Sequence, residues 1–77
     1  MDATKLVQMA NQIGAFFGAN PDTATAADSV ADHIRRFWDP RMRRALLKWV
    51  DERNGEGLQP LVLQALQKHR EKLQPAT

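Results

Sequence analysis

The sequence predicts a small all-α protein, a four-helix bundle that forms a single domain over residues 1–77. Apolar residues recur with a spacing near 3.6 in four consecutive segments, which is the period of an amphipathic helix. No segment alternates apolar and polar residues over the length of a strand, so β-structure is not expected. The connections between the four segments are short, and this favours compact packing of neighbouring helices.

The composition limits how such a chain can be stabilised. Chains of this length bury only about 60% of the surface of their unfolded form, which leaves a small stability margin. The sequence contains no cysteine, so disulfides, iron–sulfur clusters and thiolate zinc sites are excluded. Absence of cysteine also fits a reducing compartment. Stability must therefore come from close helix packing, from a partner, or from both.

The first helix is expected at residues 4–18. Its end is assigned to Gly18 and Asn20, because both residue types tolerate the left-handed conformation that closes many helices. One apolar stripe runs along it and comprises Leu6, Met9, Ala10, Ile13, Phe16 and Phe17.

The second helix is expected at residues 21–38. Asn20 is a suitable N-cap, Pro21 suits the first helical position, and Asp22 suits the positive end of the helix dipole. Pro40 disfavours a helical conformation in the residue before it, so the helix must end at Trp38 or Asp39. The apolar stripe comprises Ala27, Val30, Ala31, Ile34, Phe37 and Trp38.

The third helix is expected at residues 40–53, with Asp39 as its cap and Pro40 at its first position. The run of residues 53–57, RNGEG, is typical of a turn that ends a helix. A fourth helix is expected at residues 59–73, starting near Pro60, and residues 74–77 are expected to form a frayed tail.

Ten consecutive residues at the junction of the second and third helices form the strongest candidate for a binding surface. They combine five arginines with two aromatic residues and a proline: Arg35, Arg36, Phe37, Trp38, Asp39, Pro40, Arg41, Met42, Arg43 and Arg44. Arg35 and Arg36 suit the negative end of the second helix. Arg41, Arg43 and Arg44 lie at the positive end of the third, where cations are disfavoured by about 0.3–1 kcal/mol each. Either these arginines form a solvated cluster or they meet negative charge on a partner.

Five aromatic side chains fall on the apolar stripes, and a bundle this small need not bury all of them. Any that stays exposed would contribute to a docking patch. Spacing alone does not identify which aromatics are exposed. The five candidates are Phe16, Phe17, Phe37, Trp38 and Trp49.

No arrangement of residues indicates catalysis or metal binding. His33 and His69 each lack a second histidine at helical spacing; His33 is expected at the helix surface and His69 at the edge of the core. Ser29 lies in the middle of a predicted helix without a nucleophile-elbow motif. No strand precedes any glycine, so none belongs to a phosphate-binding loop. We expect no catalytic, cofactor-binding or metal-ligating residue.

Three blocks of the sequence resemble the delta subunit of NAD-dependent, molybdenum-containing formate dehydrogenase. These are residues 9–17 (MANQIGAFF), 37–43 (FWDPRMR) and 57–62 (GLQPLV), and the resemblance extends over about residues 6–66. The central block is the most specific, because it combines aromatics, a helix-breaking corner and arginines in one order. The chain after Leu66 lies outside the resemblance.

The resemblance implies a small cytoplasmic component of a soluble bacterial complex that oxidises formate and reduces NAD+. It further implies that the alpha subunit holds a molybdenum bis-guanine-dinucleotide cofactor and iron–sulfur clusters. The beta and gamma subunits would carry flavin and further clusters, and the delta subunit none.

The residues and the resemblance together predict a non-catalytic accessory subunit. It would dock residues 37–44 on the alpha subunit and stabilise that subunit's active, cofactor-loaded form. An assembly chaperone for the same enzyme would use the same surface, and a homo-oligomer or a small basic nucleic-acid-binding protein are further alternatives. Neither a membrane span nor a signal peptide is expected from the sequence, so the predicted location is the cytoplasm.

Overall fold

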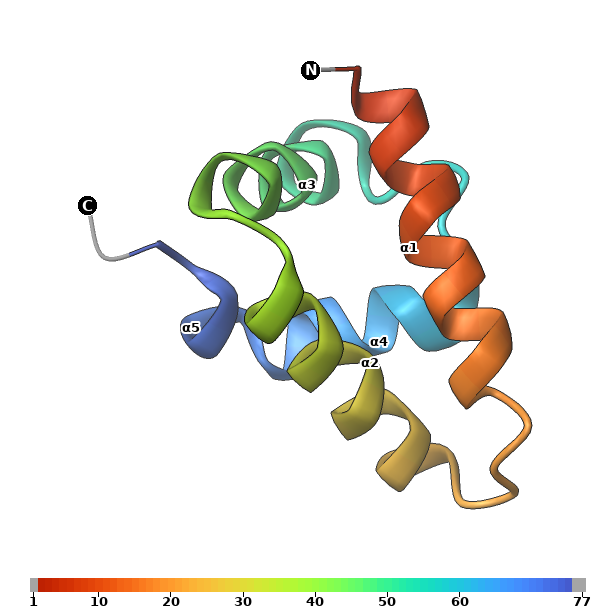
Figure 1. The fold of residues 1–77 in the computed structure, drawn as a ribbon. Coiled ribbons are helices and arrows are strands. Elements are labelled where there is room, and N and C mark those ends of the chain that lie inside the picture. Colours follow the sequence, from red (N-terminus) through yellow and green to blue (C-terminus); the bar gives the residue numbers. More distant parts are fainter. Residues whose placement is uncertain (1, 76–77) are drawn as a thin grey trace.

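The computed structural model describes residues 2–75, and within that range the chain is entirely helical between its turns. The helices are α1 (Ala3–Phe17), α2 (Thr23–Phe37), α3 (Pro40–Arg53), α4 (Pro60–Lys68) and α5 (Arg70–Leu73). Figure 1 shows them in chain order from red to blue. The predicted all-α class is confirmed for these residues. Of the predicted frayed tail, Gln74 and Pro75 follow α5 outside any helix, and residues 76–77 lie outside the described range.

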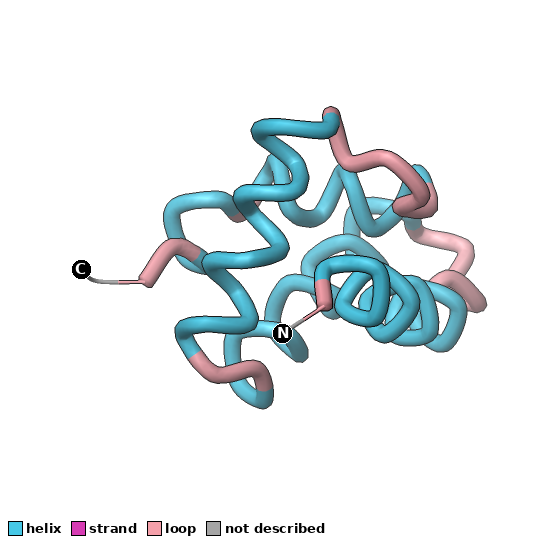
Figure 2. Tube along the Cα trace, turned by 90° about the horizontal axis from the view of Figure 1, so that it is seen from above, coloured by secondary structure: helices cyan, strands magenta, loops and turns pink. Residues whose placement is uncertain are grey.

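Helix α2 holds the structure together, because it packs against α1, α4 and α5. Helix α1 also contacts α3 and α4. The helices cross one another at steep angles and do not share one common direction (Figures 1 and 2). Residues from all five helices therefore meet in one core, to which α2 contributes more than any other helix: Leu6, Val7, Ala10, Ala27, Val30, Ala31, Ile34, Trp38, Leu46, Leu47, Val62, Ala65, Leu66 and Leu73.

The start of α2 differs from the prediction. We expected Asn20 as the N-cap and Pro21 as the first helical residue, but Asp22 is the N-cap. Its backbone is extended, and its carboxylate accepts a hydrogen bond from the backbone N–H of Thr25 at 3.2 Å. Asn20 instead accepts a bond from the Asp22 N–H at 2.9 Å, so it orders the turn before the cap. The helix begins two residues later because the carboxylate is already the cap.

The end of α1 was also predicted with the wrong backbone conformation. Gly18 is the C-cap, but its φ of −65° and ψ of −11° are right-handed helical values. Its N–H donates to the carbonyl oxygen of Gly14 at 2.7 Å, so the last turn of α1 closes without a left-handed residue.

The α2–α3 corner and the end of α3 follow the predicted chemistry. Asp39 caps α3 by accepting a bond from the Met42 N–H at 2.9 Å, and Pro40 occupies the first turn. At the other end Asn54 takes a left-handed conformation with φ 55°, and Gly55 follows with φ 69°. These are the residue types that tolerate positive φ, so the turn ends α3 as expected.

The predicted fourth helix is divided at His69. Its φ of −110° and ψ of 25° lie outside the helical region, so α4 and α5 are separate helices. The backbone hydrogen bonds continue through this point, from the His69 N–H to Ala65 and from the Leu73 N–H to His69. The division is therefore a local kink. In residues 2–75 no helix has the length and apolar character needed to span a bilayer.

Candidate partner-docking surface

The two adjacent aromatic residues at the end of α2 point in different directions. Trp38 is buried in the core at 6% exposure, whereas Phe37 is 71% exposed. Because helix α2 ends at Phe37, Trp38 adopts an extended backbone (φ −88°, ψ 136°) and turns its ring inward. The predicted interface thus contains one aromatic that belongs to the core and one that is available to a partner.

The two arginines before Phe37 are both exposed on α2. Arg36 pairs with Asp32 one turn earlier at 3.2 Å, with both side chains more than half exposed. Arg35 instead lines a hollow of about 470 Å³ together with Asp28, Ala31, Asp32, His69 and Lys72. Exposed pairs of this kind contribute only about 0–1 kcal/mol, so Arg36 can exchange its partner at little cost.

Arg43 is engaged within the chain. Its Nη1 atom lies 3.4 Å from the carbonyl oxygen of Leu73 at the end of α5, and its Nε atom is buried without a hydrogen-bond partner. The carbonyl oxygen of Leu73 therefore gives Arg43 an acceptor within the chain, whereas the sequence suggested an acceptor on a partner. Arg43 thus links α3 to the end of α5.

Arg41 and Arg44 are exposed in the first turns of α3. With exposed Lys48 they follow the spacing i, i+3, i+7, which places all three on one face of the helix. The other predicted interface residues play local structural roles: Asp39 and Pro40 build the corner, and half-buried Met42 packs against the core. The five arginines are thus spread over several directions and do not form one cluster.

A row of four rings crosses from α1 to α2. The centroids of Phe16 and Phe17 are 5.0 Å apart, those of Phe17 and His33 6.0 Å, and those of His33 and Phe37 4.7 Å. Among the described residues, Phe16 and Phe37 are the large apolar side chains left exposed, at 75% and 71%. We call these four residues the ring row. His33, predicted at the helix surface, is half-buried within it because it lies between two phenyl rings.

The other two aromatics of the apolar stripes pack onto the body of the protein. Phe17 and Trp49 are half-buried against the core. The Trp49 indole N–H donates to the carbonyl oxygen of Glu56 at 2.7 Å, and the Arg53 guanidinium lies over its ring. Phe16 and Phe37 are therefore the two exposed aromatics that the spacing left unidentified.

A groove of about 380 Å³ adjoins the ring row. Its lining comes from the exposed side of α1 and from the end of α2: Met9, Gln12, Ile13, Phe16, Phe17, His33 and Trp38. The sequence allowed for a docking patch of exposed aromatics, but it identified neither the groove nor the rings that line it. A signal for it was present, since residues 6–21 contain no ionisable side chain, which is unusual for a helix with one face in water.

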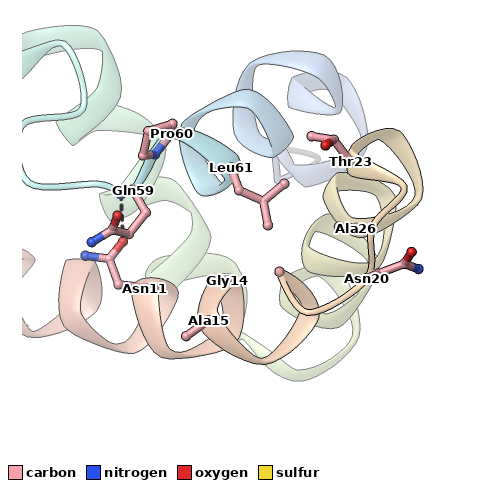
Figure 3. A pocket seen from close by; sticks show the side chains of 10 residues that line it. Asn11, Gly14, Ala15, Asn20, Thr23, Ala26, Gln59, Pro60 and Leu61 are labelled. Atoms are coloured by element: carbon pink, nitrogen blue, oxygen red, sulfur yellow. Dashed lines mark hydrogen bonds between the residues drawn. The ribbon is translucent and has the colours of Figure 1, made fainter.

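A second hollow, of about 400 Å³, lies where α1, α2 and α4 meet (Figure 3). Asn11 closes one end of it: its side chain donates to the Gly57 carbonyl oxygen and accepts from the Gln59 N–H, both at 2.9 Å. Its lining consists of small, apolar and uncharged polar residues and includes no ionisable side chain. Asn11 thus fastens the α3–α4 connection to α1, and the hollow offers no group for proton transfer.

His69, at the end of α4, connects this helix to α2 through a polar contact with Asp28. His69 Nε2 lies 2.6 Å from Asp28 Oδ1, and Lys68 Nζ lies 3.2 Å from the same oxygen. The hydrogen bonds from His69 and then Lys68 hold the pKa of the Asp28 carboxyl below its ordinary value. Nearby, Arg70 binds Asp51 through two bonds of 2.8 and 2.6 Å. Residues 2–75 contain no group of three or more His, Cys, Asp or Glu side chains placed to hold a metal ion.

Comparison with known proteins gives one family. A family model described as NADH-dependent formate dehydrogenase delta subunit FdsD matches residues 5–66, which include the ring row and the α2–α3 corner. Neither the curated proteins nor the solved structures gave a match.

Proposed function

Because the chain belongs to the family of NADH-dependent formate dehydrogenase delta subunits, we propose that it is a non-catalytic accessory subunit that docks on the large, molybdenum-bearing subunit of such an enzyme. Formate oxidation and NAD reduction are assigned to the other subunits. The same subunits are proposed to hold the molybdenum cofactor, the iron–sulfur clusters and the flavin. The chain's own part in this scheme is recognition, which takes place in the cytoplasm.

The observation that supports docking is the exposure of Arg41 and Arg44 near the N-terminal, positive end of α3, close in sequence to an exposed Phe37. Arg41 lies where the helix dipole is unfavourable to a cation, and Asp39, the acid nearest to it along the chain, accepts the capping hydrogen bond of α3. Carboxylates on a partner would remove this penalty, and guanidinium groups bind carboxylates with two parallel hydrogen bonds. Arginine and aromatic side chains are also the residues most often found at the energetic centre of an interface.

Docking would act on the large subunit by mass action. A partner that binds only the folded, cofactor-loaded form stabilises it by about 2.7 kcal/mol when its free concentration is 100 times the Kd. Loss of the delta chain should therefore lower the fraction of large subunits that retain their cofactor. The large subunit's catalytic residues would be unchanged.

The test is purification of the complex through a tag on the large subunit, with Arg41→Glu and Arg44→Glu combined in the delta chain. Arg43 is left intact because its side chain contacts Leu73 at the end of α5. The matched control is Lys72→Glu, an equal charge change per residue at an exposed position outside the family match. We expect the double variant to be lost from the complex and the control to be retained.

Unchanged delta content and unchanged formate oxidation with the double variant would contradict the docking role of the corner. If the wild-type chain raises the molybdenum content of the large subunit but is absent from the purified active enzyme, it acts as an assembly chaperone. Stoichiometry in the active complex separates these two outcomes.

A further inference from the structure

We propose that the ring row and its groove form the centre of the interface, and that they receive a bulky apolar side chain from a large-subunit segment with acidic residues on both sides. This inference rests on the proposed function, because it takes the large subunit as the partner. It moves the centre of recognition from the α2–α3 corner to the face shared by α1 and α2.

The exposure of the two outer rings is the first argument. Phe16 and Phe37 are each more than two-thirds exposed, in a chain whose core has little apolar surface to spare. They lie at the two ends of one ring row, so the exposed apolar surface is continuous from α1 to α2. Contiguous apolar surface of this kind marks an interaction site, whereas single scattered apolar residues do not.

The charge pattern of α1 is the second argument. Between Leu6 and Phe17 the helix has no ionisable side chain, although Gln8, Gln12, Ala15 and Phe16 are exposed. Interface centres are depleted of charged residues and enriched in aromatics and methionine, and the groove is lined by Met9, aromatic rings and neutral side chains. The α1 face therefore has the composition of an interface centre.

The charges at the two ends of this face identify the occupant. Lys5 is exposed one turn before Met9 on the same side of α1, and Arg36 lies one turn after His33 on α2. Arg36 pairs with the exposed carboxylate of Asp32. A neutral apolar centre with a basic residue at each end matches an apolar segment with acidic flanks.

The same charges disfavour a second copy of this chain as the occupant. A two-fold contact uses the same patch on both copies, so Lys5 and Arg36 of one copy would approach the basic residues of the other. Two acids lie near these cations, and each already has a role: Asp2, one turn before Lys5, is the N-cap of α1, and Asp32 pairs with Arg36.

The experiment uses the delta chain with Phe16→Gln and Phe37→Gln combined, and measures its binding to the tagged large subunit. Both side chains are exposed, so the thermal unfolding of the isolated variant should match that of the wild type. The matched control is Gln64→Ala with Gln67→Ala, two exposed positions on α4. We expect at least a tenfold rise in Kd for the phenylalanine variant and no change for the control. A Lys5→Glu, Arg36→Glu variant should also bind more weakly and lose part of the salt dependence of binding.

The outcomes distinguish this inference from the proposed function. If Arg41→Glu with Arg44→Glu abolishes binding and the phenylalanine variant binds like the wild type, the docking function stands and this inference is overturned. If the wild-type chain itself does not bind the large subunit, the proposed function fails and the inference with it. If the isolated chain is a dimer that the phenylalanine substitutions dissociate, with binding to the large subunit unchanged, the face is a self-association surface and the inference is also overturned.

Discussion

Gly14 in α1 lies directly against Val62 in α4, and both residues are buried. A Cβ atom added at Gly14 would overlap the Cγ2 atom of Val62. Because valine is branched at Cβ and Val62 is fully buried, the methyl group has no free space to move into. The glycine therefore sets how closely α1 can approach α4, and this approach also places Asn11 within reach of the α3–α4 connection.

Gly14→Ala is expected to lower the free energy of unfolding by about 1–3 kcal/mol, because overpacking outweighs the gain in helix propensity. Urea titration followed by circular dichroism measures this. Gln8→Ala at an exposed position of the same helix is the control and should change stability by less than about 0.5 kcal/mol. Val62→Ala should cost less in the Gly14→Ala background than in the wild type, and purely additive effects would contradict the contact.

Asn11→Ala is expected to cost about 1–3 kcal/mol, since it removes two hydrogen bonds that hold the α3–α4 connection. Asn11→Asp is the informative comparison. It keeps an acceptor for the Gln59 N–H and loses the donor to Gly57, so its stability should fall between those of the wild type and Asn11→Ala. Equal losses for the two variants would show that the bond to Gln59 contributes nothing.

The two neighbouring arginines of α3 should separate stability from docking. Arg43→Met removes the contact with Leu73 at the end of α5 and is expected to lower the midpoint of thermal unfolding. Arg41→Met changes an exposed side chain and should leave that midpoint within error while weakening binding to the large subunit. A stability loss from Arg41→Met as large as that from Arg43→Met would refute this division of roles.

Asp28 predicts a pH dependence of stability. Its pKa is lowered from 3.8 in the folded protein, first by the hydrogen bond from His69, so the unfolded chain binds more protons in acid. The contribution of Asp28 is thus complete above about pH 3.8 and is lost as the pH falls through the lower folded value. The stability difference between wild type and Asp28→Asn should shrink over that window. A difference that stays constant down to pH 2 would disprove the linkage.

Much of the fold could be predicted from the sequence because local chemistry determines it. The Asp39–Pro40 corner and the Asn54–Gly55 turn are specified by residue types whose backbone preferences are strong. The start of α2 was placed two residues early, since Asn20, Pro21 and Asp22 are all good helix starters and only the three-dimensional hydrogen bonds choose among them. The kink at His69 has no local signal, and the side chain there contacts Asp28, which is 41 residues away.

The orientation of the side chains at the candidate site could be predicted only in part, because periodicity gives poor information on direction where a helix ends. Spacing placed Phe37 and Trp38 on the same stripe. Because α2 ends between them, Phe37 points into solvent and Trp38 points into the core. The arginines were treated as one cluster because they are close in sequence. Arg43 bonds to a carbonyl oxygen 30 residues away, which no local pattern indicates.

The different surroundings of the two tryptophans have a practical consequence. Trp38 lines the groove from within the core, while Trp49 is tied to Glu56 in the turn after α3. A Trp49→Phe chain would keep Trp38 as a single intrinsic fluorophore at the proposed contact. Its emission wavelength and its quenching by acrylamide would then report occupancy of the groove in real time, without any label on either protein.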